Sequence, residues 1–135
     1  MSIPRQMVST GDVGITIKLF GINGYFVDST ITENPIAVAF GGYFLWDKGS
    51  QRITNGQLID IYGSSTISGE MDNETLIFNK KYPKMSIPYH FKKQNGFWVG
   101  EYEHPKLKRV EPAKSITNLV EKDDFIIICG KKISF

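Results

Sequence analysis

The chain has 135 residues, a length that fits one domain with a single hydrophobic core over residues 1–135. Its hydrophobic content of 41% is enough to build such a core, which excludes a wholly disordered chain. A formal net charge of +2 is too small to indicate a nucleic-acid partner through bulk electrostatics. Because Cys129 is the single cysteine, an intrachain disulfide and a cysteine-rich zinc site are also excluded.

The N-terminal segment lacks the continuous apolar stretch of a secretory signal. No apolar run approaches the roughly 20 residues that a membrane helix needs. We therefore expect a cytoplasmic protein with no membrane partner.

Turn signals recur along the chain. Three Asn-Gly pairs each lie between apolar or aromatic segments: Asn23-Gly24, Asn55-Gly56 and Asn95-Gly96. Both residues of a type I′ hairpin turn need positive φ, which Asn and Gly tolerate, so each pair predicts a hairpin. The first is predicted to join strands at 15–20 and 25–29. A long strand is predicted next at 36–46, with a bulge or bend at Gly41-Gly42.

The middle of the chain predicts a meander of five short strands, at 57–62, 65–70, 75–82, 86–92 and 97–103. Connections this short force neighbouring strands to be antiparallel. Side-chain alternation along 75–82 places Phe78, Lys80 and Tyr82 on one face. Because Phe78 belongs in a core, we expect this face to point inward.

The C-terminal part predicts a short helix and a last strand. Pro112 can open a helix, and apolar residues follow it at helical spacing as far as Glu121. The continuous apolar run at 125–129 then predicts a buried or closing strand. So many strands in one domain must protect their edges, which favours a mainly β, closed or nearly closed antiparallel barrel with a short C-terminal helix. A two-layer sandwich is the alternative.

Several motifs over residues 57–103 resemble the meander of lipocalin-like (calycin-like) barrels, a group that includes avidins and small uncharacterised bacterial proteins. These motifs are Gly63-x-x-x-x-x-Gly69, Phe78-x-Lys80-x-Tyr82 and Gly96-x-Trp98-x-Gly100-Glu101-Tyr102. The resemblance implies a barrel whose open mouth can hold a small apolar or amphipathic molecule. The Gly-x-Trp of the first lipocalin strand is absent and no set of residues matches the biotin contacts of avidins, so the resemblance assigns no binding residues.

Lys80 and Tyr82, with Glu101 on a nearby strand, form the sharpest candidate site. If both strands turn these residues inward, a lysine and a carboxylate meet in a lumen of low dielectric constant, where they can hold the polar head of a ligand. The alternative is a Lys80–Glu101 pair across two strands at the barrel rim, worth about 0.2–1 kcal/mol. The candidate ligand-binding residues are Phe78, Lys80, Tyr82, Tyr89, Trp98 and Glu101.

Other chemistry has weaker support in the sequence. His90 lies on the opposite face of its strand from Tyr89, and His104-Pro105 has the character of a strand-end turn, so we expect no metal site and no cofactor. Cys129 has apolar neighbours, which predict a buried and inert thiol. No nucleophile elbow, phosphate-binding loop or dinucleotide fingerprint occurs. Basic and aromatic residues alternate after residue 80, but lysines that protect strand edges explain them better than a nucleic-acid surface.

Three functional hypotheses follow. The leading one is a non-catalytic lipocalin-like domain that binds a small amphipathic ligand in the barrel. The second is a protein interaction module or homo-oligomer that uses a sheet edge or the aromatic and basic face. The third is a small barrel enzyme that uses Lys80 and Glu101.

Overall fold

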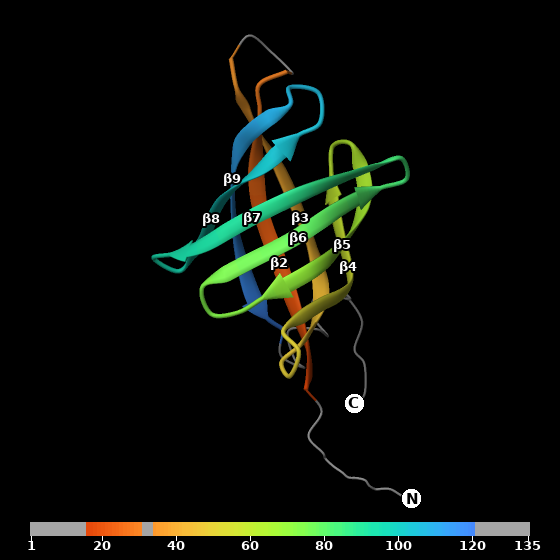
Figure 1. The fold of residues 1–135 in the computed structure, drawn as a ribbon, viewed down its shortest axis with the longest axis vertical. Helices are drawn as coiled ribbons and strands as arrows, with labels where there is room; N and C mark the ends of the chain where they lie inside the picture. The colour runs from red at the N-terminus through yellow and green to blue at the C-terminus, as the bar shows by residue number, and fades with distance from the viewer. Residues whose placement is uncertain (1–15, 31–33, 121–135) are drawn as a thin grey trace, which may run out of the picture.

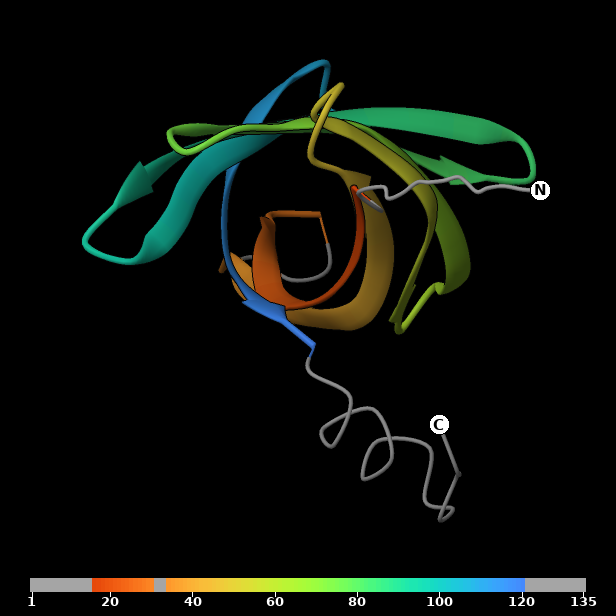
Figure 2. The same cartoon turned by 90° about the horizontal axis from the view of Figure 1, so that it is seen from below.

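The computed structural model describes residues 16–30 and 34–120, which form an antiparallel barrel. Its strands are β2 (Ile17–Asp28), β3 (Ile36–Asp47), β4 (Arg52–Asp60), β5 (Gly63–Met71), β6 (Thr75–Tyr82), β7 (Met85–Gln94), β8 (Phe97–His104) and β9 (Arg109–Leu119). Each strand pairs with the next, and β9 pairs with β2, so the sheet closes into a ring (Figures 1 and 2). The predicted barrel is confirmed, and the sandwich alternative is wrong.

The predicted meander is also confirmed, with β4 to β8 following one another in antiparallel order. The third Asn-Gly pair forms the predicted turn between β7 and β8, where Asn95 and Gly96 have φ of 51° and 83°. Such positive values at both positions are the signature of a type I′ turn.

The first Asn-Gly pair does not form a turn, so that prediction is wrong. β2 runs without a break through Asn23 and Gly24 and pairs with both β3 and β9. A Cβ atom at Gly24 would lie 2.2 Å from the carbonyl oxygen of Lys114 on β9. Glycine is needed here because two backbones approach closely, a requirement that looks the same as a turn in the sequence.

The hairpin predicted at the second pair, Asn55-Gly56, is also wrong, because both residues lie inside β4. The register between β4 and β5 shifts between Ile53 and Gly56, and Asn55 has a φ of 47°. The pair therefore forms a bulge that bends the strand. In β3 the expected irregularity falls just after Gly41-Gly42, with a register shift between residues 43 and 45.

The predicted C-terminal helix is wrong, because residues 109–119 form β9. Burial along this strand alternates: Glu111, Ala113 and Ser115 are buried, whereas Pro112 and Ile116 are exposed. Of the apolar residues that gave a helical spacing, Ile116 points outward, whereas Leu119 lies on the inner face opposite Phe20, exposed at the end of the strand. The strand predicted at 125–129, including Cys129, lies outside the described residues.

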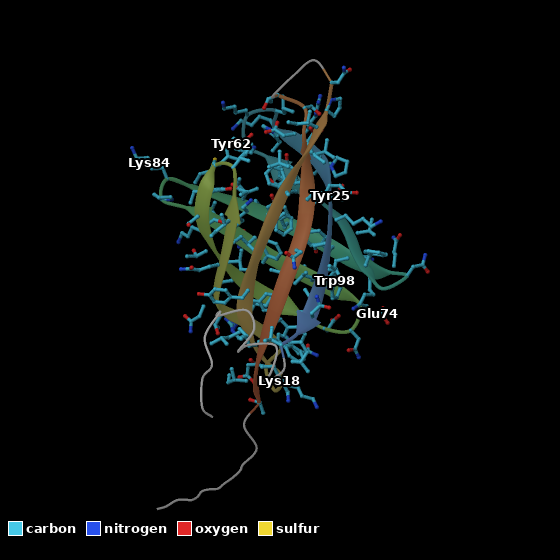
Figure 3. All side chains as sticks on the ribbon, turned by 180° about the vertical axis from the view of Figure 1, so that it is seen from behind. Lys18, Tyr25, Tyr62, Glu74, Lys84 and Trp98 are labelled. Carbon is cyan, nitrogen blue, oxygen red and sulfur yellow. The ribbon has the colours of Figure 1, made fainter. Side chains whose placement is uncertain are left out.

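The core fills the barrel interior with aromatic and aliphatic side chains, among them Phe26, Phe44, Phe78, Tyr89 and Trp98. The turns that follow β4, β6 and β8 gather with the end of β2 at one end of the barrel, which we call the mouth (Figure 1). Figure 3 shows Tyr62 and Lys84 at this end and Lys18 at the opposite end. Within the described part of the chain, no helix is long and apolar enough to cross a membrane.

Candidate ligand-binding site

A cavity of about 540 Å³ lies in the mouth. Phe26, Ile87, Tyr89 and Tyr102 contribute most of its apolar wall. Its polar lining residues are Asp28, Thr30, Tyr62, Lys80, Tyr82, Lys84, His104 and Lys106. Because side chains alternate along a strand, the inward residues at the mouth ends of β2, β6, β7 and β8 converge on this space.

A buried ion pair lies at the cavity, between the Lys80 ammonium and the Asp60 carboxylate. Lys80 Nζ is 2.5 Å from Asp60 Oδ2, and the two side chains are 1% and 0% exposed. The Tyr82 hydroxyl donates to the same oxygen at 2.6 Å. Burial lowers the pKa of Lys80, and the hydrogen bond and charge of Asp60 oppose that shift. Burial, together with the Asp60 carboxylate, raises the pKa of Tyr82.

Aromatic rings surround the same ammonium group. Its nitrogen lies 4.5 Å from the centroid of the Phe26 ring and 5.3–5.7 Å from the centroids of Phe40, Tyr82 and Tyr89. The faces of aromatic rings carry partial negative charge, so this cage stabilises a cation where water is excluded.

Asp28 organises a second polar cluster nearer the rim. Its carboxylate accepts hydrogen bonds from the backbone and hydroxyl of Thr30 at 2.9 and 2.6 Å, from the Tyr62 hydroxyl at 2.8 Å and from His104 Nε2 at 3.0 Å. Burial disfavours the charge of Asp28, but these hydrogen bonds outweigh it and hold the pKa of Asp28 well below its usual range. Burial and the bond to Asp28 raise the pKa of Tyr62 to about 12.

The backbone fixes the orientation and tautomer of His104. Its Nδ1 accepts the backbone N–H groups of Lys106 and Leu107 at 3.1 and 3.2 Å, so Nδ1 carries no proton. Nε2 therefore carries the proton and donates it to Asp28. This chain of bonds ties the β8–β9 turn to the end of β2.

The hydroxyl of Tyr89 differs from the other polar groups of the cavity. Its ring stacks between Phe78 and Tyr102, with centroids 5.1 Å away in both cases. Burial raises the pKa of Tyr89, which keeps the phenol protonated. No hydrogen bond joins this hydroxyl to another residue of the described ranges, although it lines the cavity. A protonated phenol can both donate and accept a hydrogen bond.

Three of the six candidate residues from the sequence, Lys80, Tyr82 and Tyr89, line this cavity together. Phe78 is 1% exposed, and its ring stacks on the ring of Tyr89. Trp98 is buried elsewhere in the barrel, where its indole N–H donates to the Thr117 hydroxyl at 3.0 Å. Phe78 is therefore a core residue beneath the site, and Trp98 is a core residue away from it.

Glu101 lies on the outer surface, so both forms of the predicted Lys80–Glu101 contact are wrong. The inward residues of β8 are Trp98, Tyr102 and His104, and Glu101 has the opposite parity. Glu101 and the exposed His90 instead line an outer hollow of about 520 Å³ across β7 and β8. Among the described residues, no cluster of three or more His, Cys, Asp or Glu side chains is placed to hold a metal ion.

The sequence reasoning missed Asp28, Asp60 and His104. The sequence did contain an indication for Asp60, because it is two residues from the buried Leu58 and so lies on the same inward face of the strand. His104 likewise shares the parity of Tyr102. The partners are far apart in the chain, because His104 is 76 residues from Asp28 and Lys80 is 20 residues from Asp60. Alternation alone indicates which residues point inward, but not which of them meet.

The closed antiparallel barrel is consistent with the calycin-like fold that the motifs resemble. No protein-family model, no curated protein and no solved structure matches this chain, so the interpretation of the site rests on its geometry.

Proposed function

We propose that this barrel binds a small amphipathic molecule in its mouth cavity, in the manner of lipocalin-like proteins. The observation that carries the proposal is a cavity of about 540 Å³ in which a few polar groups converge between aromatic walls. Binding sites for small molecules have volumes of about 300–1,000 Å³ and the same combination of apolar lining and few polar groups.

The walls suit a flat or slender apolar body. Phe26 meets the Tyr102 ring edge-on at 5.3 Å, and Tyr102 stacks on Tyr89. The rings of Phe26, Tyr89 and Tyr102 all line the cavity, and aromatic contacts with a ligand contribute about 0.5–1.5 kcal/mol beyond the area they bury.

The polar groups suit a head with hydrogen-bond acceptors. The Tyr89 hydroxyl has a proton to donate, and the Lys80 ammonium has N–H groups beyond the one that Asp60 accepts. Lys84 and Lys106 are exposed at the rim and draw negative charge toward the mouth. A carboxylate or carbonyl compound with an apolar body meets these requirements.

The cavity is formed in advance, which favours binding. Asp28 fixes Tyr62 and His104 through hydrogen bonds, and Asp60 fixes Lys80 and Tyr82. A ligand need not order these side chains, so little of its interaction energy is lost to conformational entropy.

The test combines native mass spectrometry of the purified chain with thermal unfolding in the presence of decanoic acid, cinnamic acid and their alcohols. A ligand at 100 times its Kd raises stability by about 2.7 kcal/mol. We expect at least one of these compounds to raise the Tm of the wild type.

Two tryptophan variants locate the binding site. Ile87→Trp fills the cavity from β7 and is expected to abolish the shift in Tm. Ile77→Trp on the outer face of β6 is the matched control and is expected to keep it. Equal shifts in both variants, or no shift with any compound in the wild type, would overturn the proposal.

Self-association through the outer surface is a second candidate function. Ile59 and Ile61 are 64% and 71% exposed near the mouth end of β4, and Tyr43 on β3 is 45% exposed. Because β2 to β9 form a closed ring, the described strands offer no free edge, so side chains would have to form the contact. Sedimentation velocity distinguishes the two ideas: a dimer that Ile59→Lys dissociates supports association, and a monomer at about 100 μM argues against it.

A further inference from the structure

Lys80 differs in its surroundings from its neighbour Lys81. Lys81 points outward and is exposed, whereas Lys80 is 1% exposed and lines the mouth cavity. The amine of Lys80 is thus placed where a bound molecule can meet it, beside a carboxylate that can accept its proton.

We propose that Lys80 forms a reversible imine with an amphipathic aldehyde held in the mouth cavity, with Asp60 as the proton acceptor and donor. This inference rests on the proposed function, because the aldehyde must first bind between the aromatic walls. It names the class of ligand, a carbonyl compound able to react with a primary amine.

The proton moves first. Asp60 takes it from the Lys80 ammonium along the hydrogen bond of 2.5 Å, which leaves a neutral amine beside a carboxylic acid. In a medium of low dielectric constant this neutral pair costs less, relative to the ion pair, than it does in water. Burial lowers the pKa of Lys80 in the same direction. Desolvation of this kind is a recognised way to activate a lysine nucleophile.

Addition and dehydration then balance without an external reagent. The lone pair of Nζ forms a bond to the carbonyl carbon, the carbonyl π pair moves to oxygen, and a proton passes from nitrogen to that oxygen to give a carbinolamine. The Asp60 carboxylic acid returns its proton to the hydroxyl, which leaves as water while the nitrogen lone pair forms the C=N bond. The products are water, a protonated imine and the Asp60 carboxylate.

The surroundings of Nζ stabilise that product. A protonated imine keeps the positive charge that the ammonium had, so the Asp60 carboxylate remains its counter-ion and the rings of Phe26 and Tyr89 continue to face a cation. Tyr82 holds Asp60 in place through its hydrogen bond of 2.6 Å. The Tyr89 hydroxyl, which has a proton to donate, is available to polarise the incoming carbonyl group.

The test exposes the full chain to cinnamaldehyde or decanal at neutral pH, reduces any imine with sodium borohydride, and locates the product by intact mass and peptide mapping. We expect one adduct per chain, on Lys80. Lys80→Arg keeps the positive charge beside Asp60 but has no primary amine, so it is expected to lose the adduct. Lys81→Arg removes an exposed lysine and is expected to leave the labelling unchanged.

The role of Asp60 has its own measurement. Asp60→Asn cannot take the proton, so we expect labelling of Lys80 to slow by at least about tenfold, as is usual for the loss of a positioned acid–base group. An unchanged rate in a folded Asp60→Asn variant would remove Asp60 from the proposal. If either variant fails to fold, the position of the adduct in the wild-type peptide map still decides the matter.

The alcohols separate this inference from the proposed function, because they share the apolar body but cannot form an imine. If cinnamyl alcohol or decanol raises the Tm while Lys80 stays unmodified by the aldehydes, the imine is refuted and ligand binding stands. Modification spread over exposed lysines with Lys80 untouched refutes the imine as well. If neither the alcohols nor the aldehydes bind, both proposals fail.

Discussion

The ion pair between Lys80 and Asp60 makes a quantitative prediction about stability. Since both side chains are almost wholly inaccessible, removal of one partner leaves a buried group without compensation. For buried pairs that loss is about 3–5 kcal/mol, compared with about 0–1 kcal/mol for exposed pairs. We therefore expect Lys80→Met and Asp60→Asn each to lower the free energy of unfolding by about 3 kcal/mol or more.

The double variant Lys80→Met/Asp60→Asn separates the pair from its surroundings. The asparagine oxygen still accepts the Tyr82 hydroxyl. The Tyr62 backbone N–H, which Asp60 Oδ1 accepts at 2.8 Å, loses this acceptor, but it lies at an exposed position where water can replace it. The double variant is expected to lie within about 1 kcal/mol of the wild type, because the cost of desolvating two ions disappears with their attraction. The resulting coupling energy of several kcal/mol is the signature of a desolvated pair.

Urea unfolding followed by tryptophan fluorescence supplies the free energies, and the control is removal of Arg109, the exposed partner in the Arg109–Glu111 pair. Their charged atoms are 3.6 Å apart and the Arg109 side chain is 60% exposed, so Arg109→Met is expected to cost less than about 1 kcal/mol. If Asp60→Asn costs no more than Arg109→Met, the Lys80–Asp60 pair is solvated and the reasoning is refuted.

Three further predictions concern pH and packing. The folded-state pKa of Asp28 lies below its ordinary value of 3.8, so the stability that Asp28 contributes is present above about pH 4 and is lost as the pH falls through the folded-state pKa. Urea midpoints between pH 5 and pH 2 should fall less steeply in Asp28→Asn than in the wild type, and parallel curves would contradict this. The folded-state pKa of Tyr62 is raised from 10.0 to about 12, so its contribution is present below pH 10 and is lost as the pH rises toward 12. Absorbance at 295 nm should therefore show part of the tyrosine ionisation only when circular dichroism shows unfolding, and complete ionisation near pH 10 of a folded chain would count against it. A Cβ at Gly100 would lie 1.8 Å from the carbonyl oxygen of His90, whereas one at Gly21 meets nothing closer than 3.9 Å. Gly100→Ala should thus lower the Tm strongly and Gly21→Ala hardly at all. Thermal unfolding measures both, and equal Tm values for the two variants would contradict the prediction.

The sequence was a good guide where the physics is local. Alternation along β6 correctly placed Phe78, Lys80 and Tyr82 inside, and the Asn95-Gly96 turn formed as expected because its two residues face only local constraints. The pairing of neighbouring strands also followed from the short connections between them.

Long-range geometry explains what the sequence did not reveal. Gly24 has the composition of a turn but serves the contact between β2 and β9, whose residues are about 90 positions apart. The apolar spacing after Pro112 resembled a helix because both faces of β9 carry apolar residues near its end, with Ile116 on the outer face and Leu119 on the inner face. The error at Glu101 was one of parity: Trp98 and Tyr102 take the interior, and a shift of one residue exchanges the two faces of a strand.

The contact between β2 and β9 also divides the folding of this protein into two kinds of step. Each pair from β2–β3 to β8–β9 joins neighbouring strands, but the ring closes only when Phe20 comes opposite Leu119 at the far end of the described chain. The entropy of closing such a long loop is lost before its contacts form, so we expect the hairpins to assemble early and the β2–β9 pairing to set the folding rate. Until that pairing forms, β2 and β9 are open edges to which other chains can add. Because a Cβ at Gly24 would collide with the β9 backbone, we expect a larger residue there to hinder this pairing and to prolong the exposure of the two open edges.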